Sequence, residues 1–301
     1  MILSKNNKLA LKGDIMAPKP AAKTERCISP DDLINQVIET QQILQQEDDL
    51  SPRNPRITKT LTAFVQNVIA AEQSFTEAEK QEVLDNRLVK TIRPSLLNGL
   101  SRAEYEMELY FSDLFINNPN FTEDSLNDFW YLQNYIDLVD LELEAITLPA
   151  DATKEAVFIG SGPLPLTAII MAQKTGMHIT CLDVDEYAII RGHELTRKLG
   201  IGDQIQYKQS AGHEYDYKNA ALVMIASLVG NKEAVLDTIQ NTADEPPQVA
   251  IRSAEGLHAL LYEPVTPSIL NDFNMCVKKQ TRQEPRVINT TLMCGFKQNF
   301  R

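Results

Sequence analysis

A glycine turn is the clearest sign of chemistry in this chain. The segment reads VFIGSGPLPL, an apolar run that ends at Gly160 and Gly162 before a predicted helix. Glycines let a backbone turn sharply and approach a ligand, and the amides at a helix start favour an anion. The next predicted strand closes on two acids, Asp183 and Asp185, which are placed to bind ribose hydroxyls. Together these features predict a pocket for a nucleoside cofactor.

Two prolines, Pro163 and Pro165, distinguish this turn from the usual dinucleotide-binding sequence pattern. The third glycine of that pattern is absent, and the prolines stiffen the turn and remove amide donors. A compact carboxylate therefore suits the turn better than a pyrophosphate does. A small carboxylate with a ribose indicates S-adenosylmethionine; the alternative is a tight turn that binds no ligand. The expected cofactor-binding residues are Gly160, Ser161, Gly162, Pro163, Leu164, Asp183 and, as a second choice for the ribose, Asp185.

The elements that would position this turn alternate between strand and helix after about residue 150. Such alternation predicts right-handed crossovers and a mostly parallel sheet covered on both faces, with the ligand beyond the carboxyl ends of the strands. A last run, residues 286–293, is expected to be an antiparallel edge strand. The predicted parallel strands are 156–160, 178–183, 204–208, 221–226 and 248–252, and the predicted helices are 164–175, 186–199 and 231–241.

The first half of the chain has a helical pattern and no convincing strand before residue 155. Ser29-Pro30-Asp31-Asp32 is typical of a helix start. Further helices are expected over 58–71, after Thr76, over 101–117 and over 131–146. The fold class is therefore α/β: an all-α domain over 28–150 that precedes a Rossmann-like domain over 151–301, with residues 1–27 a disordered extension.

Composition excludes several classes of function. A protein with a net charge of −12 would be repelled by nucleic-acid phosphates and by anionic membrane surfaces. No apolar run approaches the roughly 20 residues of a membrane span, and no signal peptide is legible. The four cysteines are scattered and the four histidines lack ligand spacing. We therefore expect reduced thiols, a cytoplasmic location and no catalytic metal.

The glycine turn also resembles the signature of the nicotianamine synthase family. Four more pieces of that family's pattern follow in order across about residues 95–265: AE…E…F at residues 103–111, YLQNY at 131–135, IASLVG at 225–230 and RSAEG…LY at 252–262. The family includes plant enzymes and bacterial aminobutyrate transferases that make opine-type metallophores. Its members transfer the 3-amino-3-carboxypropyl group of S-adenosylmethionine to an amine and release methylthioadenosine.

The resemblance implies S-adenosylmethionine as a co-substrate and no metal requirement, although the family's products chelate metals. It leaves the acceptor open, since a chain like this could use histidine or S-adenosylmethionine itself. It is compatible with a homodimer. An ordinary S-adenosylmethionine-dependent methyltransferase is the alternative, because it would share the cofactor pocket but not the ordered motifs outside it.

The transfer needs a neutral amine and a group that takes its proton. Glu104 and Glu108 lie four residues apart on one predicted helix face, and the family uses a glutamate from this helix. Glu104 could instead close a capping box with Ser101, and Glu108 could be a solvated acid. Tyr131 and Tyr135 have the same spacing, and each is either a catalytic ring or a core tyrosine.

Four residues near the predicted strand ends complete the candidate site. Arg252 closes the fifth predicted strand, where it either binds a substrate carboxylate or forms an internal ion pair. His258 stands where plant members carry arginine and is expected to contact the acceptor. Ser227 and Leu228 follow the fourth predicted strand and are expected to line the adenine pocket.

Overall fold

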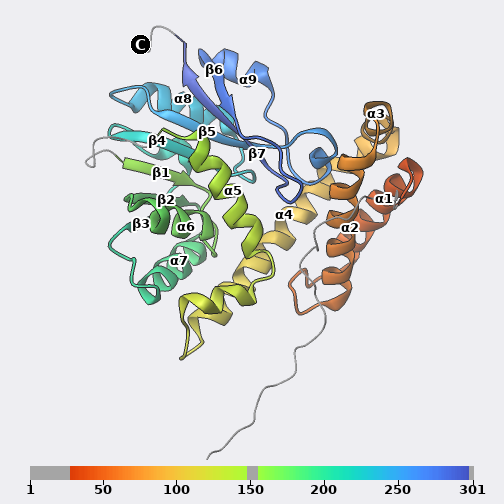
Figure 1. Cartoon of the computed structure of the whole chain (residues 1–301), viewed down its shortest axis with the longest axis horizontal. Coiled ribbons are helices and arrows are strands. Elements are labelled where there is room, and N and C mark those ends of the chain that lie inside the picture. The colour runs from red at the N-terminus through yellow and green to blue at the C-terminus, as the bar shows by residue number, and fades with distance from the viewer. Residues whose placement is uncertain (1–27, 148–154, 298–301) are drawn as a thin grey trace, which may run out of the picture.

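The computed structural model describes residues 28–147 and 155–297. The predicted extension over 1–27 and the predicted domain boundary near 150 lie outside these residues. Figure 1 shows the sheet at one end of the molecule, α1–α3 at the other and the long helix α4 between them. The helices of the first half are α1 (Pro30–Gln46), α2 (Pro55–Ser74), α3 (Glu77–Asp85), α4 (Arg87–Ile116), the 3-10 turn η1 (Glu123–Asp128) and α5 (Leu132–Ala145).

The start of α1 is as predicted, because Ser29 and Asp32 cap each other's backbone N–H groups. The predicted start at residue 101 is wrong. α4 begins at Arg87, where Asn86 caps the Leu88 amide, and it continues through Pro94 to Ile116. Ser101 and Glu104 thus lie inside the helix, and the capping box between them does not exist.

Tertiary packing explains why α4 continues past residues that usually end a helix. Proline removes an internal hydrogen bond and glycine weakens a helix. However, Leu96 and Ala103 are buried, and a Cβ on Gly99 would lie 3.0 Å from the Leu44 side chain. α4 therefore packs closely on α1 at Gly99, and this packing holds the helix together across Pro94.

The sheet has the order β3-β2-β1-β4-β5-β7-β6. β1 to β5 are parallel and match the predicted strands, and β7 runs antiparallel to β5 and β6. The order reverses between β1 and β4, so the crevice for a ligand opens at their carboxyl ends. The strands are β1 (Glu155–Ile159), β2 (Ile179–Asp183), β3 (Ile205–Gln209), β4 (Ala220–Ile225), β5 (Gln248–Ser253), β6 (Met275–Gln280) and β7 (Thr290–Phe296).

The last two strands differ from the prediction. β7 is antiparallel as expected, but it starts at Thr290 and lies between β5 and β6 rather than at the edge. The edge strand β6 was missed because, after Met275, its residues are mostly exposed and polar. Lysines are typical of a protected sheet edge and leave little apolar alternation to detect.

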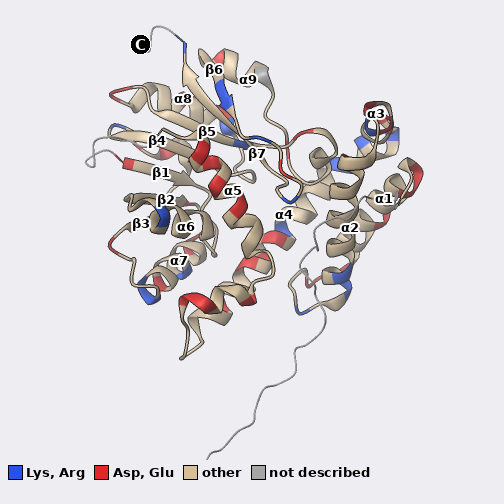
Figure 2. Cartoon of the chain, viewed as in Figure 1, with Lys and Arg blue, Asp and Glu red and all other residues tan. Residues whose placement is uncertain are grey.

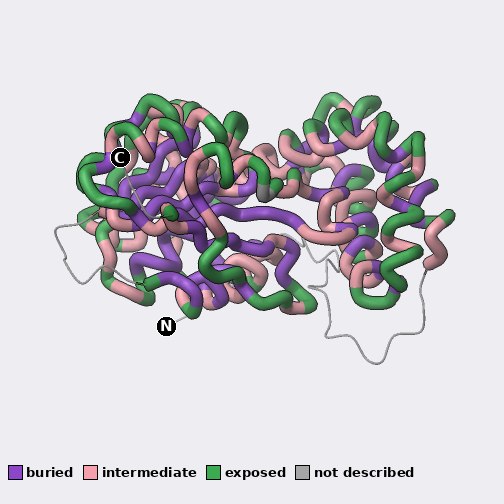
Figure 3. Tube along the Cα trace, turned by 90° about the horizontal axis from the view of Figure 1, so that it is seen from above, coloured by how far each residue is buried: buried purple, intermediate pink, exposed green. Residues whose placement is uncertain are grey.

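The hydrophobic cores combine residues from the two halves of the chain. Phe111, Phe129 and Val139 from the helical half share a core with Phe158 and the sheet. Conversely, Leu257 packs among α1–α4. Figure 3 shows buried segments in both ends of the molecule. The helices of the second half are α6 (Leu166–Thr175), α7 (Glu186–Lys198), η2 (Gly212–Glu214), α8 (Lys232–Thr242), η3 (Gly256–Leu260) and α9 (Pro267–Asp272).

None of the helices in the two described ranges is long and apolar enough to cross a bilayer. Figure 2 shows acidic residues along α5, whose charged residues are all acidic, whereas α4 carries both signs of charge.

Candidate active site

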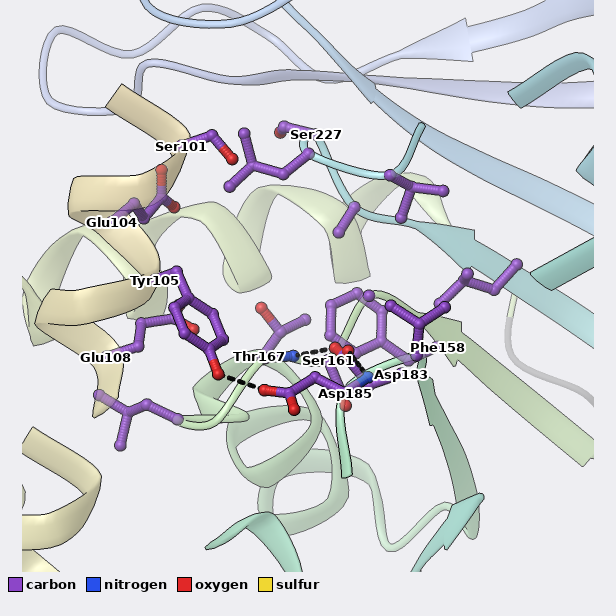
Figure 4. Close-up of a pocket in the computed structure, with 18 of the residues that line it drawn as sticks. Ser101, Glu104, Tyr105, Glu108, Phe158, Ser161, Thr167, Asp183, Asp185 and Ser227 are labelled. Atoms are coloured by element: carbon purple, nitrogen blue, oxygen red, sulfur yellow. Dashed lines mark hydrogen bonds between the residues drawn. The ribbon is translucent and has the colours of Figure 1, made fainter. Parts of the chain in front are cut away.

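A cavity of about 1260 Å³ opens at the carboxyl ends of β1, β2 and β4 and is closed from the other side by α4. It lies at the switch point of the sheet, where a ligand is expected. Figure 4 shows Glu104 and Glu108 of α4 with Asp183, Asp185 and Ser161 from the sheet side. The predicted residues that line it are Glu104, Glu108, Tyr131, Tyr135, Gly160, Ser161, Gly162, Leu164, Asp183, Asp185, Ser227, Leu228 and Arg252, while Pro163 and His258 do not.

Both glycines of the turn have left-handed backbones, with φ of +76° at Gly160 and +67° at Gly162. A Cβ on Gly160 would lie 2.7 Å from the Val229 side chain, and one on Gly162 would collide with the Glu108 carboxylate. The turn therefore needs glycine for its conformation and also for its contact with α4.

The amides of the turn residues donate hydrogen bonds within the protein. Gly160 and Ser161 donate to the Leu182 carbonyl, at 2.8 and 3.2 Å. Gly162 donates to Asp183 Oδ2 at 2.9 Å. These bonds tie the turn after β1 to the end of the neighbouring parallel strand β2. The Ser161 hydroxyl is buried and has no partner in the described part of the chain, so it remains available to a ligand.

The two acids after β2 have different surroundings. Asp183 accepts backbone N–H groups from Gly162 and Asp185. Asp185 caps α7 through the Tyr187 amide and accepts the Tyr105 hydroxyl with its other oxygen. Sequence reasoning missed Tyr105. Its spacing of three residues from Glu108 on one helix was the available signal.

The centre of the cavity holds two glutamate–tyrosine pairs. Tyr135 donates to Glu108 Oε1 at 2.8 Å, and Tyr262 donates to Glu104 Oε2 at 3.0 Å. Tyr262 was noted in the sequence only as part of a motif. No local pattern pairs it with Glu104, which lies 158 positions away in the chain.

The surroundings of the two pairs raise the pKa values of both carboxyl groups. Burial raises the pKa of Glu104. Burial and then the charge of Glu104 raise the pKa of Glu108 well above its ordinary value. Burial likewise raises the pKa of Tyr131 and of Tyr135, so both stay hydrogen-bond donors. Two close carboxyl groups in a desolvated site are suited to hold a cation and to take up its proton.

Arg252 forms an internal ion pair, the second of its two predicted interpretations, and also lines the cavity. Its Nε and Nη2 donate to Glu142 at 2.9 and 3.0 Å, and Nη2 also donates to Thr167 at 2.9 Å. Glu142 is fully buried. The sequence did not single it out, because an acid in a predicted amphipathic helix is ordinarily a surface residue.

His258 lies in η3, away from the cavity lining. Burial lowers its pKa, and its Nε2 is buried without a partner in the described ranges. This placement does not support the predicted contact with the acceptor.

The loop after β4 lies where the adenine contacts were predicted. The Ser227 hydroxyl accepts a hydrogen bond from the Asn289 side-chain amide at 2.8 Å. The Lys232 ammonium donates to the Ser227 carbonyl at 3.0 Å. Leu228 borders the cavity with 44% of its surface exposed, which leaves an apolar face for a flat ring.

No group of three or more metal-ligating side chains occurs within residues 28–147 and 155–297.

A family model described as nicotianamine synthase protein matches residues 27–299. Nicotianamine synthase 2 of Arabidopsis thaliana is 30% identical over 233 residues, which cover 71% of this chain and 70% of that protein. L-Histidine 2-aminobutanoyltransferase of Pseudomonas aeruginosa is 32% identical over 150 residues, which cover 50% of this chain and 56% of that protein. The match thus spans little more than half of the Pseudomonas protein.

Solved structures show the same fold. The structure of MtNAS in complex with MTA and tNA superposes with a TM-score of 0.76 at 17% identity, covering 89% of this chain and 97% of that one. A point mutant of MtNAS in complex with S-adenosylmethionine gives a TM-score of 0.74 at 18% identity, covering 87% and 97%. The predicted α/β fold is confirmed, and the family model covers both the helical half and the sheet. The chain belongs to the nicotianamine synthase family.

Proposed function

We propose that this protein transfers the 3-amino-3-carboxypropyl group of S-adenosylmethionine to an amine and releases methylthioadenosine, in the synthesis of a nicotianamine- or opine-type metallophore. The observation that carries the proposal is the pairing of Glu104 with Tyr262 and of Glu108 with Tyr135, in one cavity with the glycine turn. Family membership supports it, since the relatives named above carry such activities in their names.

The reaction is a displacement at carbon. The amine nitrogen attacks the carbon of the aminocarboxypropyl group that is bonded to sulfur, a C–N bond forms, and the C–S bond breaks with its electron pair going to sulfur. The nitrogen then loses a proton, which an ionised Glu104 or Glu108 accepts. Three carbons on the sulfonium are open to attack, so the position of the amine decides which one reacts.

The donor is assigned to the sheet side of the cavity. Asp185 and Asp183 are the candidates for the ribose, and Ser161 offers an unpaired hydroxyl. Leu228 and the Ser227 backbone would border the adenine. Arg252, held by Glu142, would face the donor carboxylate with its positive charge. Placing the sulfonium near Glu108 then offsets the cost of ionising that acid.

Two acceptors are open. The Pseudomonas relative is named for histidine, and S-adenosylmethionine itself is the second candidate. A cytoplasmic location and a homodimer remain predictions, which fractionation and light scattering would test.

Product analysis tests the proposal. The pure protein is incubated with S-adenosylmethionine alone and then with an added amino acid, and the products are identified by mass spectrometry. We expect methylthioadenosine together with an aminobutyrate adduct. Release of S-adenosylhomocysteine with a methylated acceptor would instead identify a methyltransferase.

A further inference from the structure

A second cavity of about 240 Å³ lies on the far side of the catalytic residues. Glu104, Tyr131, Tyr135 and Tyr262 line both this cavity and the large one, as does Asn134, whereas Glu108 lines only the large one. Glu104 is therefore the acid that a molecule in the second cavity would meet, while Glu108 faces the glycine turn.

The wall of the second cavity is mainly apolar. It is built by one face of α2, by the adjoining face of α4 and by residues around η3. Glu104 and Arg286 are the charged side chains among the residues that line it, and Arg286 is exposed. The apolar lining residues include Ile57, Leu61, Val65, Ile69, Leu100, Ala103, Met107, Trp130, Leu261 and Ile288.

Three polar side chains in this wall, Thr58, Gln133 and Asn134, already donate hydrogen bonds within the protein. The Thr58 hydroxyl donates to the Pro52 carbonyl at 3.4 Å, and the Gln133 amide donates to Asp137 at 2.7 Å. The Asn134 amide donates to the Arg286 carbonyl. A polar side chain placed here would have to compete for these groups, and a buried polar group without a partner is costly.

We infer that the second cavity binds the side chain of the amine acceptor, and that this acceptor is an amino acid with a neutral, apolar side chain. This inference rests on the proposed function. The amine would lie at Glu104, next to the donor, with the side chain among Leu61, Val65 and Met107. The volume of about 240 Å³ falls below the roughly 300–1,000 Å³ of pockets for drug-sized ligands. It therefore suits an amino-acid side chain better than a second S-adenosylmethionine.

A comparison of different amino-acid acceptors tests the inference with the intact protein. S-Adenosylmethionine is supplied with leucine, methionine, phenylalanine, histidine or aspartate, or with no amino acid, and methylthioadenosine release is measured. We expect kcat/KM for the best apolar amino acid to exceed that for histidine and aspartate by at least about tenfold, since burying a polar or charged side chain without a partner is costly. Preference for histidine, or equal release without any amino acid, would overturn the inference.

Two substitutions of Val65 test the location. Val65→Phe fills the cavity and should raise KM for the apolar acceptor at least about tenfold, with an unchanged Kd for S-adenosylmethionine. Val65→Ala should improve the use of a larger acceptor such as tryptophan. Ala63→Phe is the matched control, because Ala63 is exposed on the same helix and lies outside the cavity lining.

The two proposals fail differently. If no amine supports methylthioadenosine release, the proposed function is wrong. If release occurs but both Val65 variants keep the wild-type acceptor KM and preference, only the assignment of the second cavity is wrong.

Discussion

Glu108 is the side chain on which the contacts of the site converge. Its carboxylate accepts the Tyr135 hydroxyl, is hydrogen-bonded by the Leu164 backbone and lies against Gly162. Residues from α4, α5 and the turn after β1 thus meet at one carboxyl group.

The first prediction concerns proton transfer. Glu108→Gln removes the base but keeps the shape of the side chain, so we expect kcat to fall about 10²–10⁴-fold, with a Kd for S-adenosylmethionine within a few-fold of wild type. Stopped assays of methylthioadenosine and calorimetry measure the two quantities. Glu82→Gln, an exposed acid on α3, serves as the control. Full turnover in both Glu108→Gln and Glu104→Gln would disprove the assignment of the acids.

Substitution of Gly162 tests whether its close contact with Glu108 matters for catalysis. Gly162→Ala places a Cβ against Glu108, whereas Gly176→Ala, at a similar φ of +71°, meets nothing within 4 Å. Both substitutions carry the backbone cost of about 1–2 kcal/mol. We expect Gly162→Ala to lose at least ten times more kcat than Gly176→Ala at comparable melting temperature. Equal losses would show that the contact with Glu108 is unimportant.

The raised pKa of Glu108 also predicts a pH dependence of stability. The folded protein holds this proton above the ordinary value of 4.5, where the unfolded chain releases it. The free energy of unfolding therefore falls as pH rises through the window between the two pKa values. Glu108→Gln should lack this loss. Melting temperatures measured between about pH 4 and pH 8 should diverge as pH rises; parallel curves would contradict the raised pKa.

At the scale of elements, the Arg252–Glu142 pair joins β5 to α5 behind the cavity. Thr167 of α6 and Thr291 of β7 complete its hydrogen bonds. This network holds four elements in place, and it fixes the one buried guanidinium among the residues that line the large cavity.

Breaking this pair should destabilise the protein strongly. Glu142→Leu leaves the Arg252 charge buried and unpaired, which costs about 3–5 kcal/mol. The double variant Glu142→Leu/Arg252→Met removes both charges and should recover most of that loss. Urea denaturation measures both. A double variant that is no more stable than Glu142→Leu would argue against an unpaired charge as the cause.

At the scale of the whole molecule, two hydrophobic cores enclose one cavity. α4 contributes Ala103 to the core of the helical end and Phe111 to the core of the sheet end. The cavity lies along the stretch between them. A ligand there would contact both ends and stabilise the assembly.

Ligand binding should therefore appear as thermal stabilisation. S-Adenosylmethionine at about 100 times its Kd should add about 2.7 kcal/mol to the free energy of unfolding. The shift in melting temperature, measured by calorimetry with and without ligand, checks this value. ATP, which shares the adenosine but lacks the amino-acid part, is the matched comparison and should give a much smaller shift.

Local patterns in the sequence determined much of this protein. The β-branched runs, the glycine turn and the four-residue spacing of Glu104 and Glu108 depend on neighbours in the chain, so strands β1–β5, the switch point and the acid pair were predictable. Only the tertiary structure decided that α4 runs through Pro94, that β7 lies inside the sheet and that Tyr262 meets Glu104. These depend on packing and strand register between distant segments, which no local period encodes. The same holds for Arg252, for which the sequence left two interpretations open until Glu142 was found beside it.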